Sequence, residues 1–234
     1  MHVQPVAAVT IEVEFHGEAA HAAAFPHKGR NALDAAVLGY TAVGALRQHI
    51  EDTDRVHGVF RKGGDKPNIV PEHVTMEWMV RSATLAGLEA LKPRVAACWE
   101  AGAAATGCTC THAERGPTYA DMVDNPVLLR AYAANAAALG RVPQDPRRAG
   151  LRVVGSTDMG NISYVVPSIH PMVKVAPAGV SIHTHEFARH ARSSAGDEAV
   201  VHGAKAMAMT IADLWADPGL VGEAKQAFAA ATRP

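Results

Sequence analysis

The first clear pattern along the chain is an alternation of apolar and polar residues that begins at Val9. Apolar side chains occupy every second position as far as Phe15, and polar side chains stand between them. A period of two places successive side chains on opposite faces of a strand, so this stretch is predicted to be a half-buried strand. A second alternation at 74–80 and shorter runs at 55–62 and 108–114 predict three more strands.

Two segments between these strands show the helical period instead. Apolar residues gather on one side of 32–49, and in 85–105 they recur at intervals of three and four residues. The predicted order over residues 8–116 is therefore β-α-β-β-α-β. This order is typical of the ferredoxin-like plan, in which two helices cover one face of an antiparallel four-stranded sheet.

The pattern of predicted strands and helices changes after residue 117. Pro126 follows Asn125 and favours a helix start, with that helix ending near Gly140. A loop is predicted at 142–152, and short β-branched runs at 162–167 and 172–177 predict two strands. Residues 118–234 therefore read as α/β with too few strands for a complete doubly wound domain, which suggests that part of this domain lies elsewhere.

A final helix is predicted from Ser194, which with Asp197 three residues later resembles a capping box. Its apolar residues are spaced by four, three, four and three positions, so they would share one side of the helix. These residues are Val200, Ala204, Met207, Ile211 and Leu214. The Met and Ala residues of "AMAMTIADLW", residues 206–215, are predicted to be core.

The composition argues against a nucleic-acid-binding protein, a membrane protein and a disulfide-rich secreted protein. A net charge of −1 over 234 residues gives no basic field that would attract nucleic acid or an anionic membrane. No apolar run approaches the roughly 18 residues of a membrane span, and the first residues lack the basic and apolar regions of a signal peptide. The three cysteines, an odd number, argue against a disulfide framework. A cytoplasmic protein is expected, with partners that are neither nucleic acid nor membrane.

Histidine is the unusual residue, with 13 copies. Two of them stand beside a glutamate in "GVSIHTHEF", residues 179–187. On an extended strand His183 and His185 would share one face, and Glu186 would be the next position along. This arrangement predicts part of a metal site whose other ligands lie elsewhere. The competing interpretation is a loop with ordinary histidines.

Four stretches, in this order, resemble the M20 metallopeptidases and amidohydrolases, and most of all their dipeptidase and aminobenzoyl-glutamate hydrolase-like branch. They are "GEAAHAAAFPHKGRNALDAA", "GGDKPNIVP", "GSTDMGNISYVVPSIHP" and "IHTHEF". The resemblance spans residues 9–216. It implies a lid or dimerisation domain at 8–116, followed at 118–234 by the C-terminal half of a zinc-peptidase-like α/β catalytic domain, with the N-terminal half absent.

The resemblance also implies one or two divalent metal ions, Zn or Mn, in the complete enzyme. Of five metal-binding side chains in the family, one is a histidine near the C-terminus, which here matches His183. The other four are an H-x-D pair, a bridging aspartate and one residue of a Glu-Glu pair, whose second glutamate is the general base. This sequence contains no H-x-D and no Glu-Glu. The chain by itself is therefore expected to hold no catalytic metal.

Further site residues follow from the same resemblance. His21 matches a lid histidine that would reach the partner subunit's active site, polarise the scissile carbonyl and stabilise the oxyanion. Asn68 and Arg81 match lid positions that contact a substrate carboxylate or carbonyl, for which the planar Arg fork is suited. Met79 replaces the aspartate of the commoner D-x-R pattern. The alternative for each residue is an ordinary position in a loop, a turn or a strand end.

The turn "GSTDMGN" offers Ser156, Thr157 and Asp158 as residues lining the substrate pocket. Its glycines would let the backbone approach a ligand closely. The alternative is a tight loop with Asp158 as a helix cap. The stretch does not match the phosphate-binding pattern G-x-x-x-x-G-K-[ST].

The predicted function is metal-dependent hydrolysis of amide or peptide bonds in small N-acyl amino acids or dipeptides, by a homodimer formed through the lid. The chain alone is expected to be inactive. Two alternatives stay open. One is a non-catalytic dimerisation or binding module derived from such an enzyme. The other is a separate mononuclear site formed by His183, His185, Glu186 and His190.

Overall fold

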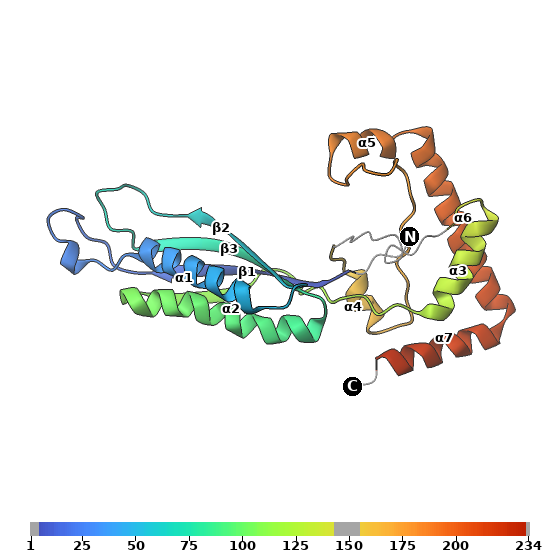
Figure 1. The fold of residues 1–234 in the computed structure, drawn as a ribbon, viewed down its shortest axis with the longest axis horizontal. Helices are drawn as coiled ribbons and strands as arrows, with labels where there is room; N and C mark the ends of the chain where they lie inside the picture. The colour runs from blue at the N-terminus through green and yellow to red at the C-terminus, as the bar shows by residue number, and fades with distance from the viewer. Residues whose placement is uncertain (1–4, 143–154, 233–234) are drawn as a thin grey trace. The chain divides into compact units, whose positions relative to one another are not determined.

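The computed structural model describes residues 5–142 and 155–232 (Figure 1). The chain divides into two compact units, Val6–Asp121 and the part from Met122 onward. Among the described residues, no helix is both long and apolar enough to cross a bilayer.

The first unit is a four-stranded antiparallel sheet covered by two helices (Figure 1). The strands lie in the order β2-β3-β1-β4. This is the ferredoxin-like plan, so the predicted order of elements is confirmed. The elements are β1 (Ala7–His16), α1 (Ala32–Leu46), β2 (Arg55–Lys62), β3 (His73–Ser82), α2 (Leu85–Thr106) and β4 (Thr109–Glu114), with short 3-10 turns at Pro26–Lys28 and Arg47–His49.

The alternating residues of the two central strands build the core of this unit. Phe15 on β1 and Trp78 on β3 are fully buried, as is Trp99 on α2, whose ring lies 5.6 Å from that of Trp78. The polar positions between them, such as Glu12 and Glu14, fall on the opposite face of the sheet, which we call the open face. The sheet therefore has one face packed against helices and one face carrying polar side chains.

Small residues allow α1 and α2 to pack closely. A Cβ added at Gly102 on α2 would lie 2.4 Å from the Ala35 carbonyl oxygen and 2.6 Å from the Gly39 nitrogen. Both atoms belong to the backbone of α1. A backbone atom cannot move aside as easily as the end of a flexible side chain. The two helices thus touch backbone to backbone at this point.

We expect Gly102→Ala to lower the free energy of unfolding by about 1–3 kcal/mol, because the extra methyl group forces the helices apart. Urea unfolding followed by circular dichroism measures this. The matched control is Gly44→Ala on α1, where an added Cβ meets no described atom within 4 Å. That change is expected to stabilise the helix by about 0.5–1 kcal/mol. Equal effects of the two substitutions would contradict the close packing.

The cysteines are all free thiols, and Cys108 is buried. Burial, with Glu100 nearby as a second cause, raises the pKa of Cys110 to about 11. At about pH 8 roughly one such thiol in a thousand would be ionised. We therefore expect Cys110 to react slowly with a disulfide reagent in the native protein and rapidly in urea. Fast native labelling, measured with Cys98 and Cys108 changed to serine, would refute this.

The second unit is helical in its described residues. Its helices are α3 (Pro126–Ala138), α4 (Met159–Ser163), α5 (His185–Ala191), α6 (Ser194–Ala216) and α7 (Pro218–Ala231). The Asn125 side chain links α3 and α7 by hydrogen bonds. Its oxygen accepts hydrogen bonds at the start of α3, and its nitrogen donates to the Ala224 carbonyl of α7 at 2.8 Å. Tyr132, Ala136 and Ala206 form the small core between α3 and α6.

The strands predicted at 162–167 and 172–177 are wrong. The first run begins inside α4 and continues as a turn, and the second has no regular structure. A strand needs a neighbour that completes its hydrogen bonds. Residues 162–167 and 172–177 form no strand ladder with a described neighbour, and nearby an isolated parallel bridge joins Asp124 and Ser168. Helix α7 was not predicted, and the loop predicted at 142–152 lies outside the described residues except for Val142.

The prediction that the Met and Ala residues of 206–215 on α6 are core is confirmed for Ala206, which is 1% exposed, and wrong for Met207. Met207, Ile211 and Val200 are 55%, 46% and 73% exposed. The helix packs instead through its small-residue side, where Ala206 and Thr210 are buried. Trp215 is 82% exposed near the end of the same helix. Helix α6 thus presents an apolar face that the described chain does not cover.

Candidate functional site

Two loops at one end of the sheet carry His21 and Asn68. His21 follows β1 and forms an antiparallel bridge with Ile69, and the Ala22 N–H donates to the Asn68 carbonyl at 3.0 Å. Both side chains are exposed. The structure therefore brings these two predicted site residues into adjacent backbone segments.

The local sequence explains how the loop of His21 is held. Glu18 and Arg30 exchange both backbone hydrogen bonds at 2.9 and 3.0 Å, which closes the loop at its base. Gly17 is required there, because a Cβ at this position would lie 2.0 Å from the Arg30 carbonyl oxygen. The Val70 N–H donates to the Ala20 carbonyl and fastens this loop to the one that carries Asn68.

The imidazole of His21 is fixed by its own loop. Its Nδ1 accepts hydrogen bonds from the Ala23 and Ala24 N–H groups at 3.3 and 3.2 Å. A neutral imidazole that accepts at Nδ1 carries its proton on Nε2. The exposed ring can therefore offer an Nε2–H donor to another molecule.

Arg81 lies far from these loops within one protomer. It stands near the end of β3, whereas the loop of Asn68 enters β3 at His73. Eight residues of extended strand span about 27 Å. The Arg81 Nη2 contacts the Met79 sulfur at 2.9 Å, so the residue that replaces the usual aspartate still touches the guanidinium. The structure does not bring Arg81 together with His21 and Asn68.

Ser156, Thr157 and Asp158 lead into α4 in the second unit. The Thr157 hydroxyl accepts the Met159 N–H at 3.3 Å and donates to the Asp158 carboxylate at 3.3 Å. Asp158 holds the N-cap position, but the capping oxygen comes from Thr157. These three residues form a polar turn whose contacts to a substrate stay a prediction.

His183 lies in a turn immediately before α5 and has a φ of 62°. It is the one non-glycine residue with positive φ in the described chain. The next residue, Thr184, caps α5 by accepting the Phe187 N–H at 3.1 Å. The expectation that His183 and His185 share a strand is therefore wrong, because the chain turns between them and His185 begins the helix.

The mononuclear site considered at this turn is not assembled. Within the described residues, three or more metal-binding side chains come together only on the first unit. His183, His185, Glu186 and His190 are exposed or half-buried around the start of α5 and do not form such a group.

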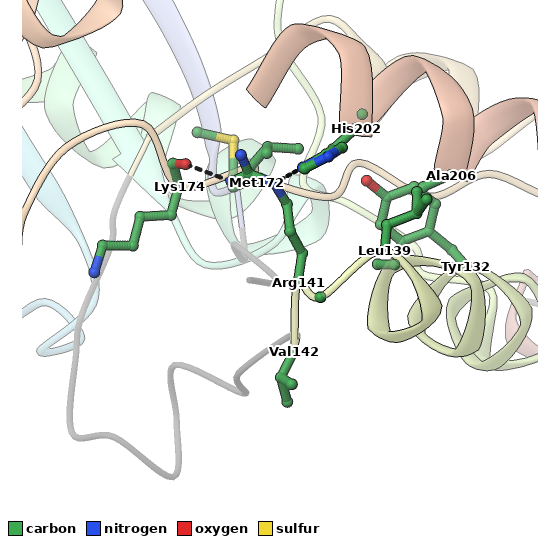
Figure 2. A pocket seen from close by; sticks show the side chains of 12 residues that line it. Tyr132, Leu139, Arg141, Val142, Met172, Lys174, His202 and Ala206 are labelled. Atoms are coloured by element: carbon green, nitrogen blue, oxygen red, sulfur yellow. Dashed lines mark hydrogen bonds between the residues drawn. The ribbon is translucent and has the colours of Figure 1, made fainter. Parts of the chain in front are cut away.

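A cavity of about 280 Å³ lies in the second unit between α3, α6 and the segment 172–174. Figure 2 shows Arg141 between His202 and Lys174. Its Nε donates to His202 Nδ1 at 2.9 Å, and its Nη1 donates to the Lys174 carbonyl at 2.9 Å. Burial raises the pKa of Tyr132 at the same cavity. The predicted residues at 156–158 and 183 are not among those that line it.

Known proteins resemble this chain in both sequence and fold. Residues 7–106 match the M20 peptidase dimerisation domain. The chain is 37% identical to Xaa-Arg dipeptidase of Mus musculus, over 97% of this chain and 52% of that protein. The chain belongs to the M20 peptidase family. It is also 26% identical to a p-aminobenzoyl-glutamate hydrolase chain of Escherichia coli (strain K12), over 91% of this chain and 55% of that protein.

Solved structures share the fold of this M20 chain. Aminopeptidase PepT from Bacillus cereus has a TM-score of 0.62 at 21% identity and covers 88% of this chain and 53% of its own. A putative aminohydrolase from Staphylococcus aureus has a TM-score of 0.64 at 15% identity, with coverages of 89% and 52%. The chain spans about half the length of the curated relatives it matches.

One cluster in this M20 chain was missed by sequence reasoning. Glu14, His16 and His73 bring one ligand atom each to within 4.8 Å of one another on the first unit. Glu14 and His16 share a face of β1 by alternation, which the sequence could have indicated. His73 is distant in sequence and joins them only through the register of β1 and β3.

Proposed function

We propose that this chain forms part of a metal-dependent hydrolase that cleaves amide or peptide bonds in small N-acyl amino acids or dipeptides. The observation that carries the proposal is the 37% identity to an Xaa-Arg dipeptidase along almost the whole chain. In this proposal residues 8–116 are the lid and dimerisation domain, and residues 118–234 are the C-terminal part of the catalytic domain.

His21 is proposed to act on the reacting carbonyl. Its Nε2–H would donate to the oxygen that becomes negative as the amide carbon turns tetrahedral. A donor held in place before the reaction stabilises that charge without further reorganisation. The two backbone bonds to Nδ1 provide this orientation. Asn68, in the adjacent loop, would contact a carbonyl or carboxylate of the same substrate.

Arg81 is proposed to grip the substrate carboxylate from the other protomer. About 27 Å of strand separates Arg81 from the loop of Asn68, which is more than a dipeptide spans. One protomer therefore cannot place both on one small substrate. A homodimer would supply His21 and Asn68 from one protomer and Arg81 from its partner.

The edge strand β2 is proposed as the dimer contact. Val59 and Phe60 on this strand are 52% and 40% exposed, and Val37 and Leu38 on α1 are 47% and 45% exposed. The opposite edge, β4, exposes no large apolar residue in its described positions. An open strand edge with apolar side chains is a surface that a second chain can complete. A second copy of this chain would therefore pair at β2.

His183 is proposed as a metal ligand from this chain. A neutral imidazole suits zinc-type ions, and His183 is exposed at a tight turn that fixes its backbone. The bound ion, when present, supplies an acidified water as nucleophile. Ser156, Thr157 and Asp158 would line the substrate pocket. The other ligands and the general base would come from outside this chain.

The exposed face of α6 is proposed to pack against that missing part. This contact would bury the exposed side chains of Met207, Ile211 and Trp215. The test is a joined protein, in which the part of mouse Xaa-Arg dipeptidase that this chain does not match is fused before Met1. We expect the joined protein to hydrolyse an Xaa-Arg dipeptide in the presence of Mn²⁺ or Zn²⁺.

Substitution of His183 by alanine in the joined protein should weaken metal binding by at least about 10-fold and lower hydrolysis accordingly. Metal content after dialysis and the initial rate measure the two effects. His185→Gln, two residues away, is the matched control and should change neither. If the control loses as much metal as His183→Ala, His183 is not the specific ligand.

The competing function is a non-catalytic dimerisation or binding module. It is favoured by one observation, that the described residues from 122 onward assemble no group of three metal-binding side chains. It predicts a dimer whose joined protein folds and binds metal no better than the chain alone.

A further inference from the structure

A group of two histidines and one glutamate lies at the end of the open face of the first unit. Glu14 and His16 stand two residues apart on β1, so their side chains emerge on the same face. His73 is the first residue of β3 and lies directly opposite His16 in the antiparallel register. All three positions are therefore fixed by the hydrogen-bonded ladder of the two central strands.

The donor atoms already converge. His73 Nε2 lies 2.8 Å from Glu14 Oε2, and His16 Nε2 lies 3.6 Å from the same oxygen. The two imidazole rings are stacked, with centroids 4.9 Å apart and planes 12° apart. One carboxylate oxygen thus faces two imidazole nitrogens, but only His73 is close enough for a hydrogen bond.

This set of donors is one that borderline divalent ions prefer. Two imidazoles and one carboxylate bind Zn²⁺ through nitrogen at about 2.0–2.1 Å and through oxygen at about 2.0–2.2 Å. An ion between the three atoms would satisfy both Nε2 atoms and the carboxylate together. The side chains of Glu14, His16 and His73 are 36%, 45% and 36% exposed, so water can reach the remaining coordination positions.

We propose that Glu14, His16 and His73 form a binding site for a zinc-type divalent ion. The ion ties the end of β1 to the start of β3. Both loops that carry His21 and Asn68 leave the sheet from this point, and the Gly17 N–H already donates to the Glu72 carbonyl there at 2.8 Å. Binding of the ion therefore stiffens the base of these loops. The site itself does not depend on the proposed hydrolysis.

The test uses the full chain and Zn²⁺ alone. Diethyl pyrocarbonate modifies accessible imidazoles, and peptide mass spectrometry reports each histidine separately. We expect Zn²⁺ to slow modification of His16 and His73 several-fold. His57 is exposed on β2 of the same sheet, away from the group, and should be modified at the same rate with and without the ion. Uniform protection of all three histidines would mean non-specific binding and would overturn the proposal.

Two variants make the result specific. Glu14→Gln keeps the size of the side chain and should weaken the zinc protection of His16 and His73 by at least about 10-fold in ion concentration. Glu77→Gln on the same face of β3, where Glu77 pairs with Arg61 at 2.6 Å, is the matched control and should leave the protection unchanged. Protection that is absent in the unaltered chain, or that survives Glu14→Gln unchanged, would refute the site.

Discussion

Replacing His21 by alanine in the joined protein is expected to lower kcat by about 100- to 1000-fold, which corresponds to about 2.7–4 kcal/mol of transition-state stabilisation. The substitution removes the Nε2–H donor whose orientation depends on the Ala23 and Ala24 N–H groups. KM should change much less, because the charge on the oxygen develops only in the transition state. Steady-state rates on an Xaa-Arg dipeptide measure both constants.

His27 provides the control for this prediction. It is an exposed histidine in the same loop, six residues further along, and its ring packs edge-on against Phe25. His27→Ala should leave kcat within a small factor of the unaltered joined protein. If both substitutions reduce kcat equally, the loop as a whole is being disturbed and the role of His21 as a donor is wrong.

Replacing Val59 by lysine is expected to weaken dimerisation by at least about 100-fold, or about 3 kcal/mol. Val59 is 52% exposed on the edge strand β2. In a two-fold dimer the same residue occurs twice in one interface, so two unpaired charges would lose water together. The monomer should keep its fold, because the side chain already lies at the surface.

Sedimentation equilibrium of the chain measures this effect. Ala113→Lys on β4 adds the same charge to the opposite edge of the sheet and should leave the dimer intact. In the joined protein, Val59→Lys should also reduce hydrolysis, since His21 and Arg81 would no longer meet on one substrate. A dimer that withstands Val59→Lys and dissociates with Ala113→Lys would place the interface at β4.

Much of the first unit could be predicted from the sequence, because its strands bury one face and expose the other. The alternation that ends at Phe15 and the one through Trp78 both set strand type and strand face. Helix α2 was likewise predicted from the helical spacing of Leu88, Leu91 and Val95, and all three residues are buried. Here local propensity and tertiary packing favour the same structure.

The second unit was predicted less well, because the structure of its segments depends on what packs against them. Residues 162–167 and 172–177 have β-branched composition, but composition alone does not supply the hydrogen-bonding neighbour that a strand requires. On α6 the sequence predicted both Ala206 and Met207 as core, whereas the described neighbours cover only the side of Ala206. Periodicity identifies an apolar face but does not name its partner.

The candidate site shows the same division. His21 and Asn68 could be selected through motifs, and the pairing of their loops came only from the fold. Arg81 lies far from His21 and Asn68 because of the direction in which β3 runs, and a sequence motif does not contain that information. The group of Glu14, His16 and His73 needs the register of β1 against β3, where a shift of one residue would separate the two histidines.

The most direct test of the central claim is the initial rate of Xaa-Arg dipeptide hydrolysis by the joined protein, compared with that of this chain alone at the same metal concentration. We expect the joined protein to release arginine and to lose this activity with His183→Ala. The chain alone should hydrolyse the dipeptide no faster than buffer without protein. Hydrolysis by the chain alone at the rate of the joined protein would contradict the account, because the metal ligands and general base would then lie within these 234 residues.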